Sequence, residues 1–187
     1  MKHTSKDLRV RRTLRSIREA FYKLMMEKKY SEISITELTE LAEVNRKTFY
    51  LHYSSLDDLI QEIEDEIVDE IMEMIDPEAE TLNVTGCISK FYHYMEDGDE
   101  IRRKLMVDPD YRNFYEDITN KVLQTSAFQH FYEITEHPYI VRAFCVSITS
   151  IYRSWIDHNR EIPLDDLINY AGTLLINGYN AVKQSEN

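Results

Sequence analysis

The sequence predicts an all-α protein with two parts: an N-terminal three-helix helix-turn-helix domain over residues 1–54 and a larger C-terminal helical domain over residues 55–187. Three observations support this prediction. The 187 residues include only four Gly and four Pro, which favours long helices joined by few loops. Apolar residues recur at spacings of three and four, without strand-like alternation. Finally, two short helical segments flank a tight turn near residue 43, as in a helix-turn-helix.

The first two helices are recognised by an apolar stripe and by a cap. A helix is expected over about residues 8–28, where one stripe recurs at helical spacing: Val10, Leu14, Ile17, Phe21 and Leu24. The next helix opens with a capping box, in which Ser34 can accept a backbone N–H and Glu37 can bond back to Ser34. A turn over residues 42–44 then leads to a third helix over residues 45–53.

The third helix carries side chains suited to DNA recognition. Asn45 can cap its N-terminus, and Arg46 and Lys47 follow in the first turn, where side chains reach base edges or phosphates. More hydrogen-bonding side chains follow: Thr48, Tyr50 and His52. Phe49 and Tyr53 lie four residues apart and can anchor the helix to its own domain. This pattern predicts a recognition helix.

Charge divides the chain in the same place. Residues 1–53 hold 12 Lys/Arg against 7 Asp/Glu, a net charge of +5, whereas residues 54–187 hold 10 against 27, a net charge of −17. Such asymmetry is typical of a nucleic-acid-binding part joined to a different part. Because phosphates repel an acidic body, we expect residues 1–53 to face the DNA.

The remainder is expected to be helical. A helix of about 20 residues begins after Ser54-Ser55 and should stop before Asp76-Pro77, because proline ends helices. Further helices are expected near 84–97, 101–106, 110–134, 138–158 and 164–182.

No catalytic, metal or cofactor site is predicted. Cys87 and Cys145 lack zinc-type spacing and are too few for a disulfide framework, so we expect reduced, partly buried thiols. His52 has no accompanying nucleophile pattern. The acids of 62–66 point in several directions on a helix. No apolar run approaches the roughly 18 residues of a membrane span, and the N-terminus lacks an apolar signal region, which together predict a cytoplasmic location.

The run from Ile35 to Tyr53 closely resembles the tetracycline-repressor (TetR/AcrR) family of bacterial transcription regulators, and the resemblance extends over residues 9–63. It implies a regulator, most often a repressor, that binds a palindromic DNA operator as a homodimer and needs no cofactor. The family's DNA-contacting roles are carried onto Arg46, Lys47, Thr48, Tyr50 and His52. Residues at the starts of the two helices complete the candidate set: Ser34, Thr36 and Asn45.

Three positions depart from the family pattern. Glu43 replaces the usual turn glycine, Tyr53 replaces Phe, and Leu56 stands where a lysine often contacts phosphate. The N-terminus of the helix at Leu56 is still expected to attract phosphate. Two alternatives stay open: a TetR-like interaction module or coactivator that has lost DNA binding, and, far less favoured, an enzyme.

The resemblance implies two further sites in the C-terminal domain. Its last two helices are expected to pair with those of a second subunit through these candidates: Phe144, Ile148, Ile151, Trp155, Leu174 and Gly178. Aromatic clusters suggest a pocket for a small-molecule effector of unknown identity, with these candidates: Tyr92, Tyr94, Tyr111, Tyr115, His130 and Trp155. A purely structural role in the core is equally open for the aromatic residues.

Overall fold

A computed structural model describes residues 2–98, 100–126, 128–129 and 138–185, and every regular element in these ranges is helical. The predicted all-α class is therefore correct. The chain divides into two compact units: unit 1 comprises residues 1–63 and 109–111, and unit 2 comprises residues 64–108 and 112–187.

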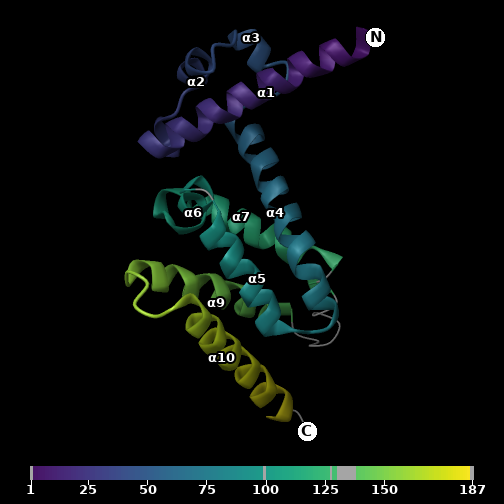
Figure 1. Cartoon of the computed structure of the whole chain (residues 1–187), viewed down its shortest axis with the longest axis vertical. Helices are drawn as coiled ribbons and strands as arrows, with labels where there is room; N and C mark the ends of the chain where they lie inside the picture. The colour runs from purple at the N-terminus through teal and green to yellow at the C-terminus, as the bar shows by residue number, and fades with distance from the viewer. Residues whose placement is uncertain (1, 99, 127, 130–137, 186–187) are drawn as a thin grey trace. The chain divides into compact units, whose positions relative to one another are not determined.

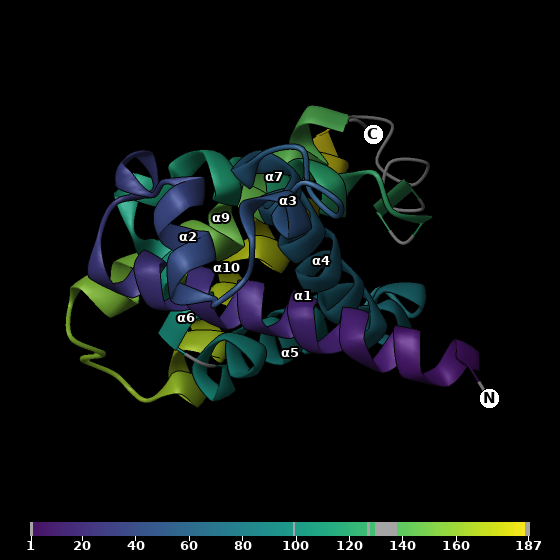
Figure 2. The same ribbon diagram turned by 90° about the horizontal axis from the view of Figure 1, so that it is seen from above.

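Unit 1 is built on one long helix and two short ones. Helix α1 spans Lys2–Glu27, α2 spans Ile35–Leu41 and α3 spans Arg46–Phe49. Helix α2 packs against both α1 and α3 (Figure 1), and Figure 2 shows the two short helices on the same side of α1. Four side chains without solvent exposure form the centre of this packing: Ile17, Phe21, Leu38 and Phe49.

The regular part of the recognition helix is shorter than predicted. Helix α3 ends at Phe49, whereas the sequence indicated a helix over residues 45–53. After Phe49 the backbone tightens, because the His52 N–H bonds to the carbonyl of Phe49 only three residues earlier (2.9 Å). The Ser54 N–H then donates to the Asp58 carboxylate (2.8 Å), which turns the chain into the next helix.

Helix α4 spans Leu56–Glu80 and continues through Pro77, so the predicted end before Asp76-Pro77 is wrong. Proline removes one backbone hydrogen bond, but burial continues past it, since Ile75 and Ala79 are 5% and 2% exposed. The helix is closed instead by Leu82, which adopts a left-handed conformation (φ 55°), and by a bond from the Asn83 N–H to the Glu78 carbonyl (2.8 Å).

Within its described residues, unit 2 contains the rest of α4 and the helices α5 (Val84–Asp97), α6 (Glu100–Val107), α7 (Arg112–Leu123), α9 (Pro138–Asp157) and α10 (Leu164–Ser185). Helix α7 ends eleven residues before the predicted limit of 134, and residues 130–134 lie outside the described part. The Thr125 hydroxyl bonds to the Val122 carbonyl (2.7 Å) and so competes with the helical backbone.

Helix α10 packs mainly on α5. Gly172 permits this contact, because a Cβ atom there would lie 2.5 Å from the Thr85 hydroxyl oxygen.

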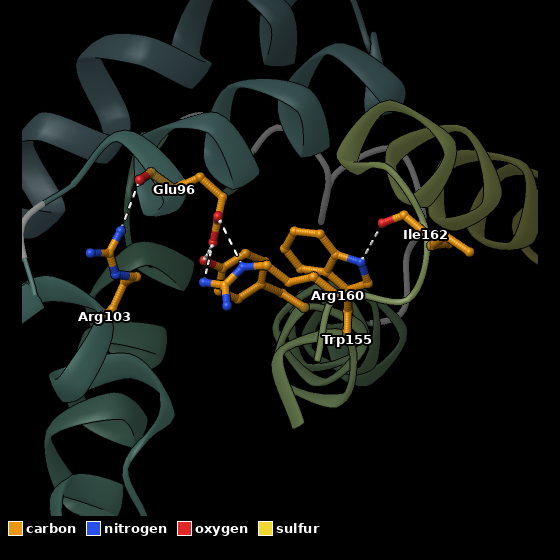
Figure 3. A network of polar contacts seen from close by, with 6 residues as sticks. Glu96, Arg103, Trp155, Arg160 and Ile162 are labelled. Atoms are coloured by element: carbon orange, nitrogen blue, oxygen red, sulfur yellow. Dashed lines mark hydrogen bonds and ion pairs between the residues drawn. The ribbon is translucent and has the colours of Figure 1, made fainter. Parts of the chain in front are cut away.

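A polar network joins α5 to the connection between α9 and α10 (Figure 3). Arg160 donates from Nε and Nη2 to the two carboxylate oxygens of Glu96 at 3.2 Å, and the Tyr152 hydroxyl donates to the same carboxylate at 2.6 Å. Arg160 also lies over the Trp155 ring, 5.4 Å from its centroid. These contacts offset the cost of the left-handed backbone at Asn159 and Arg160 (φ 54° and 56°).

Candidate nucleic-acid interface

Both predicted N-cap bonds are present, but the return bond from Glu37 that would complete the capping box at Ser34 is replaced by another contact. The Asn45 side chain accepts the Lys47 backbone N–H at 2.8 Å, and the Ser34 hydroxyl accepts the Glu37 N–H at 3.2 Å. The Glu37 carboxylate is committed to an ion pair with the Lys28 ammonium (2.5 Å). The caps fix where α2 and α3 begin, and thus which side chains lie on their first turns.

The turn between the helices has the strained geometry anticipated for a family glycine. Glu43 has a φ of 54°, and the Val44 N–H bonds back to the Thr39 carbonyl (3.0 Å). A left-handed conformation costs a non-glycine residue about 1 kcal/mol. The domain tolerates this cost because buried side chains on both sides hold the helices together.

The recognition segment separates an anchoring face from a solvent face. Phe49 and Tyr53 are 0% and 3% exposed and their rings pack together (centroids 5.5 Å apart). Thr48 is partly exposed, and the other candidate contact residues are all exposed: Ser34, Thr36, Asn45, Arg46, Lys47, Tyr50 and His52. The side chains proposed to contact DNA are therefore accessible.

Arg46 is held between the two short helices. One guanidinium nitrogen lies 3.5 Å from the Thr36 hydroxyl oxygen, and another donates to the Tyr50 hydroxyl at 3.2 Å. The Tyr50 ring centroid lies 5.6 Å from the guanidinium carbon. Because these contacts engage only part of the five-donor guanidinium, the group is oriented yet able to bind another acceptor.

Leu51 was not predicted from the sequence as a contact residue. Its side chain is 79% exposed, more than any other large apolar side chain whose exposure is described in unit 1. The sequence spacing already indicated this exposure, because Leu51 lies two residues from both Phe49 and Tyr53 and therefore on the opposite side of a helical turn. An exposed apolar group there is suited to contact a thymine methyl group.

The first turn of α4, next to Leu56, carries two carboxylates. Asp57 and Asp58 occupy its first turn, where the Asp58 carboxylate accepts the Ser54 N–H and hydroxyl, and Asp57 accepts the Tyr30 hydroxyl. The hydrogen bonds from Ser54 lower the pKa of Asp58. The negative charges of Asp57 and Asp58 oppose the attraction of a phosphate that the N-terminus of α4 would otherwise exert.

The predicted pocket residues have structural partners. Within unit 2, the Tyr92 hydroxyl donates to the Ile148 carbonyl (2.8 Å), Tyr94 to Glu70 (2.7 Å), and the Trp155 indole N–H to the Ile162 carbonyl (2.9 Å). The Tyr115 hydroxyl bonds to that of Thr149.

Two further pocket candidates lie elsewhere. Tyr111 belongs to unit 1 and donates to the Met25 carbonyl (3.3 Å), and His130 lies outside the described residues. None of the described candidates lines the cavity found in unit 2.

That cavity has a volume of about 70 Å³ and is lined by α4, α5, α6, α7 and α9 together with Phe128. Most of its lining is aliphatic or aromatic, and four side chains add thiols or hydroxyls: Cys87, Thr119, Cys145 and Thr149.

The predicted dimer residues fall into two groups. Leu174 is 64% exposed and Gly178 faces open space, but Trp155 is 7% exposed and Ile148 lines the cavity, so the last two are engaged within the subunit. Phe144 and Ile151 are partly exposed. Among the side chains described in α9 and α10, further exposed large apolar residues are Tyr139 and Val146 on α9 and Tyr170 and Ile176 on α10.

No protein-family profile and no curated protein matches the chain. Solved structures do match. A TetR transcriptional regulator from Streptococcus agalactiae 2603V has a TM-score of 0.70 at 20% identity, with 92% of this chain and 98% of that chain covered.

Two other regulators have the same fold. FadR from Bacillus subtilis, solved with stearoyl-CoA, has a TM-score of 0.64 at 16% identity, with 87% of this chain and 97% of that chain covered. The dihydroxyacetone kinase operon activator DhaS has a TM-score of 0.51 at 21% identity, with 90% of this chain and 97% of that chain covered. The fold is therefore TetR-like.

Across the described residues, no helix has the length and apolar character needed to cross a bilayer.

Proposed function

We propose that this chain is a sequence-specific DNA-binding transcription regulator, and specifically a cytoplasmic repressor that binds a palindromic operator as a homodimer. The observation that carries the proposal is Arg46, an exposed guanidinium oriented by Thr36 from α2 and by Tyr50 after α3. The transcription regulators that share the fold support the same class of function.

In this proposal, the recognition segment enters the major groove of one operator half-site. Arg46 and Lys47 read base edges, which they can do through hydrogen bonds to guanine. Neighbouring hydroxyl and imidazole groups contact phosphates and set the register: Thr48, Tyr50 and His52. The net charge of +5 over residues 1–53 supplies the attraction to the backbone.

The exposed apolar side chains of α9 and α10 support a dimer. Tyr139, Val146, Tyr170 and Leu174 are 39–68% exposed, and Gly178 leaves room for close approach of another helix. A two-fold pairing of these surfaces would match a palindromic operator. Leu174→Glu should separate the subunits without unfolding them, whereas Trp155→Glu would disturb the fold of unit 2, because Trp155 is buried within it.

We extend the proposal to a small-molecule effector. FadR, which shares the fold, was solved with stearoyl-CoA. Release from DNA requires only that the effector bind one dimer shape better than the other, and α4 provides a continuous connection because it begins in unit 1 and continues in unit 2.

A coactivator that no longer binds DNA is the second candidate. The acidic first turn of α4 and Leu56, in place of a phosphate-contacting lysine, favour it. DhaS, an operon activator of the same fold, shows that regulators of this fold are not all named as repressors.

The two candidates are separated by the salt dependence of binding to duplex DNA. The regulator should lose affinity for duplex DNA steeply between about 50 and 200 mM salt. If Lys47 contacts a phosphate, Lys47→Gln should reduce by about one the slope of the logarithm of the binding constant against the logarithm of the salt concentration. Lys90→Gln is the matched control, since it removes the same charge from an exposed site on α5 in unit 2. Absence of binding at low salt by folded protein would favour the coactivator.

A further inference from the structure

The cavity in unit 2 is apolar in character and has no formal charge in its lining. Ile71 and Ile75 from α4 and Phe91 from α5 supply much of this surface, with Met106 from α6 and Ile118 from α7. All of these side chains are uncharged hydrophobic groups. An apolar lining of this kind favours apolar occupants, because their burial removes apolar surface from water.

The hydroxyl groups of the lining are already hydrogen-bonded. Thr119 donates to the Tyr115 carbonyl at 2.9 Å. Thr149 bonds to the Val146 carbonyl at 3.0 Å, and its oxygen also contacts the Tyr115 hydroxyl. The O–H donors of Thr119 and Thr149 are therefore already used, so a ligand gains no hydrogen bond from them without breaking an existing one.

The two thiols are neutral at physiological pH. Burial raises the pKa of Cys87 to about 11, and the nearby Glu78 carboxylate adds to the shift. Burial likewise raises the pKa of Cys145 to about 12. Protonated thiols behave as small apolar groups with weak hydrogen bonding, so they add no charge to the cavity and react slowly with thiol reagents.

We propose that this cavity, formed between α4, α5, α6, α7 and α9, binds a small uncharged apolar molecule, and that it excludes molecules carrying a carboxylate or an ammonium group. Exclusion follows because a charge placed there would lose its water without gaining a partner. Binding does not depend on the proposed DNA function; only its use as the effector site rests on that function.

The volume limits the size of the occupant. About 70 Å³ is roughly half of the 150 Å³ that accepts benzene in an engineered apolar cavity. Xenon and a short hydrocarbon such as n-butane are therefore suitable probes, and butyrate and butylammonium are matched charged probes.

The chain supplies its own reporter. It contains only two cysteines, and both line the cavity. The rate at which a thiol reagent modifies the full-length protein therefore reports on this site alone, without DNA in the assay. We expect n-butane or xenon to slow modification several-fold, and butyrate and butylammonium to leave the rate unchanged.

Val122→Phe fills the cavity from α7 and should abolish protection by n-butane. Leu8→Phe adds similar bulk at an exposed position of α1 in unit 1 and should preserve it. No protection of the wild-type thiols by n-butane or xenon would overturn the proposal, as would equal protection by butyrate. If Val122→Phe does not fold, the wild-type comparison of n-butane with butyrate still decides the outcome.

Discussion

The two units use polar side chains in opposite ways. In unit 1, most polar side chains of α2 and α3 are exposed, with Thr39 buried, and Phe49 and Tyr53 anchor the recognition segment through their buried rings. In unit 2, polar groups such as Glu96 and Arg160 bond to each other, and large apolar side chains are exposed on α9 and α10. The difference indicates that unit 1 is suited to a charged, hydrogen-bonding partner and unit 2 to apolar partners.

The largest expected effect is on the anchor of unit 1. Phe49→Ala removes a side chain with no solvent exposure and should destabilise the fold by about 3–5 kcal/mol. Hydrogen exchange should show the loss of protection first in unit 1. Tyr50→Ala, at a residue 46% exposed, should cost less than about 1 kcal/mol. Equal costs for the two variants would remove Phe49 as the anchor.

The next largest effect is on DNA affinity rather than on folding stability, and it concerns Arg46. Arg46→Ala should weaken binding to the selected operator by about 1–3 kcal/mol if the guanidinium contacts a base. Arg15→Ala is the control, because Arg15 is an exposed cation of unit 1 paired with Glu19 at 2.7 Å. Titration of labelled operator measures both. An unchanged affinity for folded Arg46→Ala would exclude Arg46 from base contact.

The polar network of unit 2 should respond to pH. Burial raises the pKa of Glu96, but hydrogen bonds from Arg160 and Tyr152 outweigh it and the net shift is downward. The stabilisation is thus complete above the ordinary carboxyl pKa and is lost as pH falls through the lowered pKa. Glu96→Gln should cost about 1–3 kcal/mol near neutral pH, with a smaller difference from wild type in acid.

Urea denaturation at several pH values measures this difference. Glu73→Gln, at an exposed position on α4, should show little effect at any pH. A destabilisation by Glu96→Gln that stays constant down to strong acid would mean that the carboxylate charge is not the stabilising feature.

The smallest effect concerns the turn of unit 1. Glu43→Gly should relieve the left-handed conformation and raise the free energy of unfolding by up to about 1 kcal/mol. Glu40→Gly, within α2, should instead lower it by about 1 kcal/mol, because glycine weakens a helix interior. Thermal unfolding of the pair would refute strain at Glu43 if both variants were destabilised.

Local signals in the sequence were sufficient for much of unit 1. The caps at Ser34 and Asn45 and the left-handed Glu43 were predictable because each depends on a few neighbouring residues. The same is true of α5, whose predicted range of 84–97 agrees with the structure. The length of α3 was not predicted: the backbone tightens after Phe49, where the His52 N–H bonds to the Phe49 carbonyl, and no residue type in 45–53 marks that change.

Long-range packing decided the points where prediction failed. Pro77 does not end α4, because burial of Ala79 in unit 2 outweighs the lost hydrogen bond. Tyr92 bonds to the Ile148 carbonyl, 56 residues away, and no local pattern reveals such a contact. For the same reason, the aromatic clusters could be identified in the sequence, but the cavity lining around Cys87 and Cys145 could not.

The central claim is that unit 1 reads a DNA sequence. Selection from random duplex DNA, followed by affinity measurements at two salt concentrations, tests it most directly. The account predicts enrichment of a palindrome whose binding weakens steeply with salt. Folded, dimeric protein that enriches no sequence and does not bind duplex DNA at low salt would contradict it.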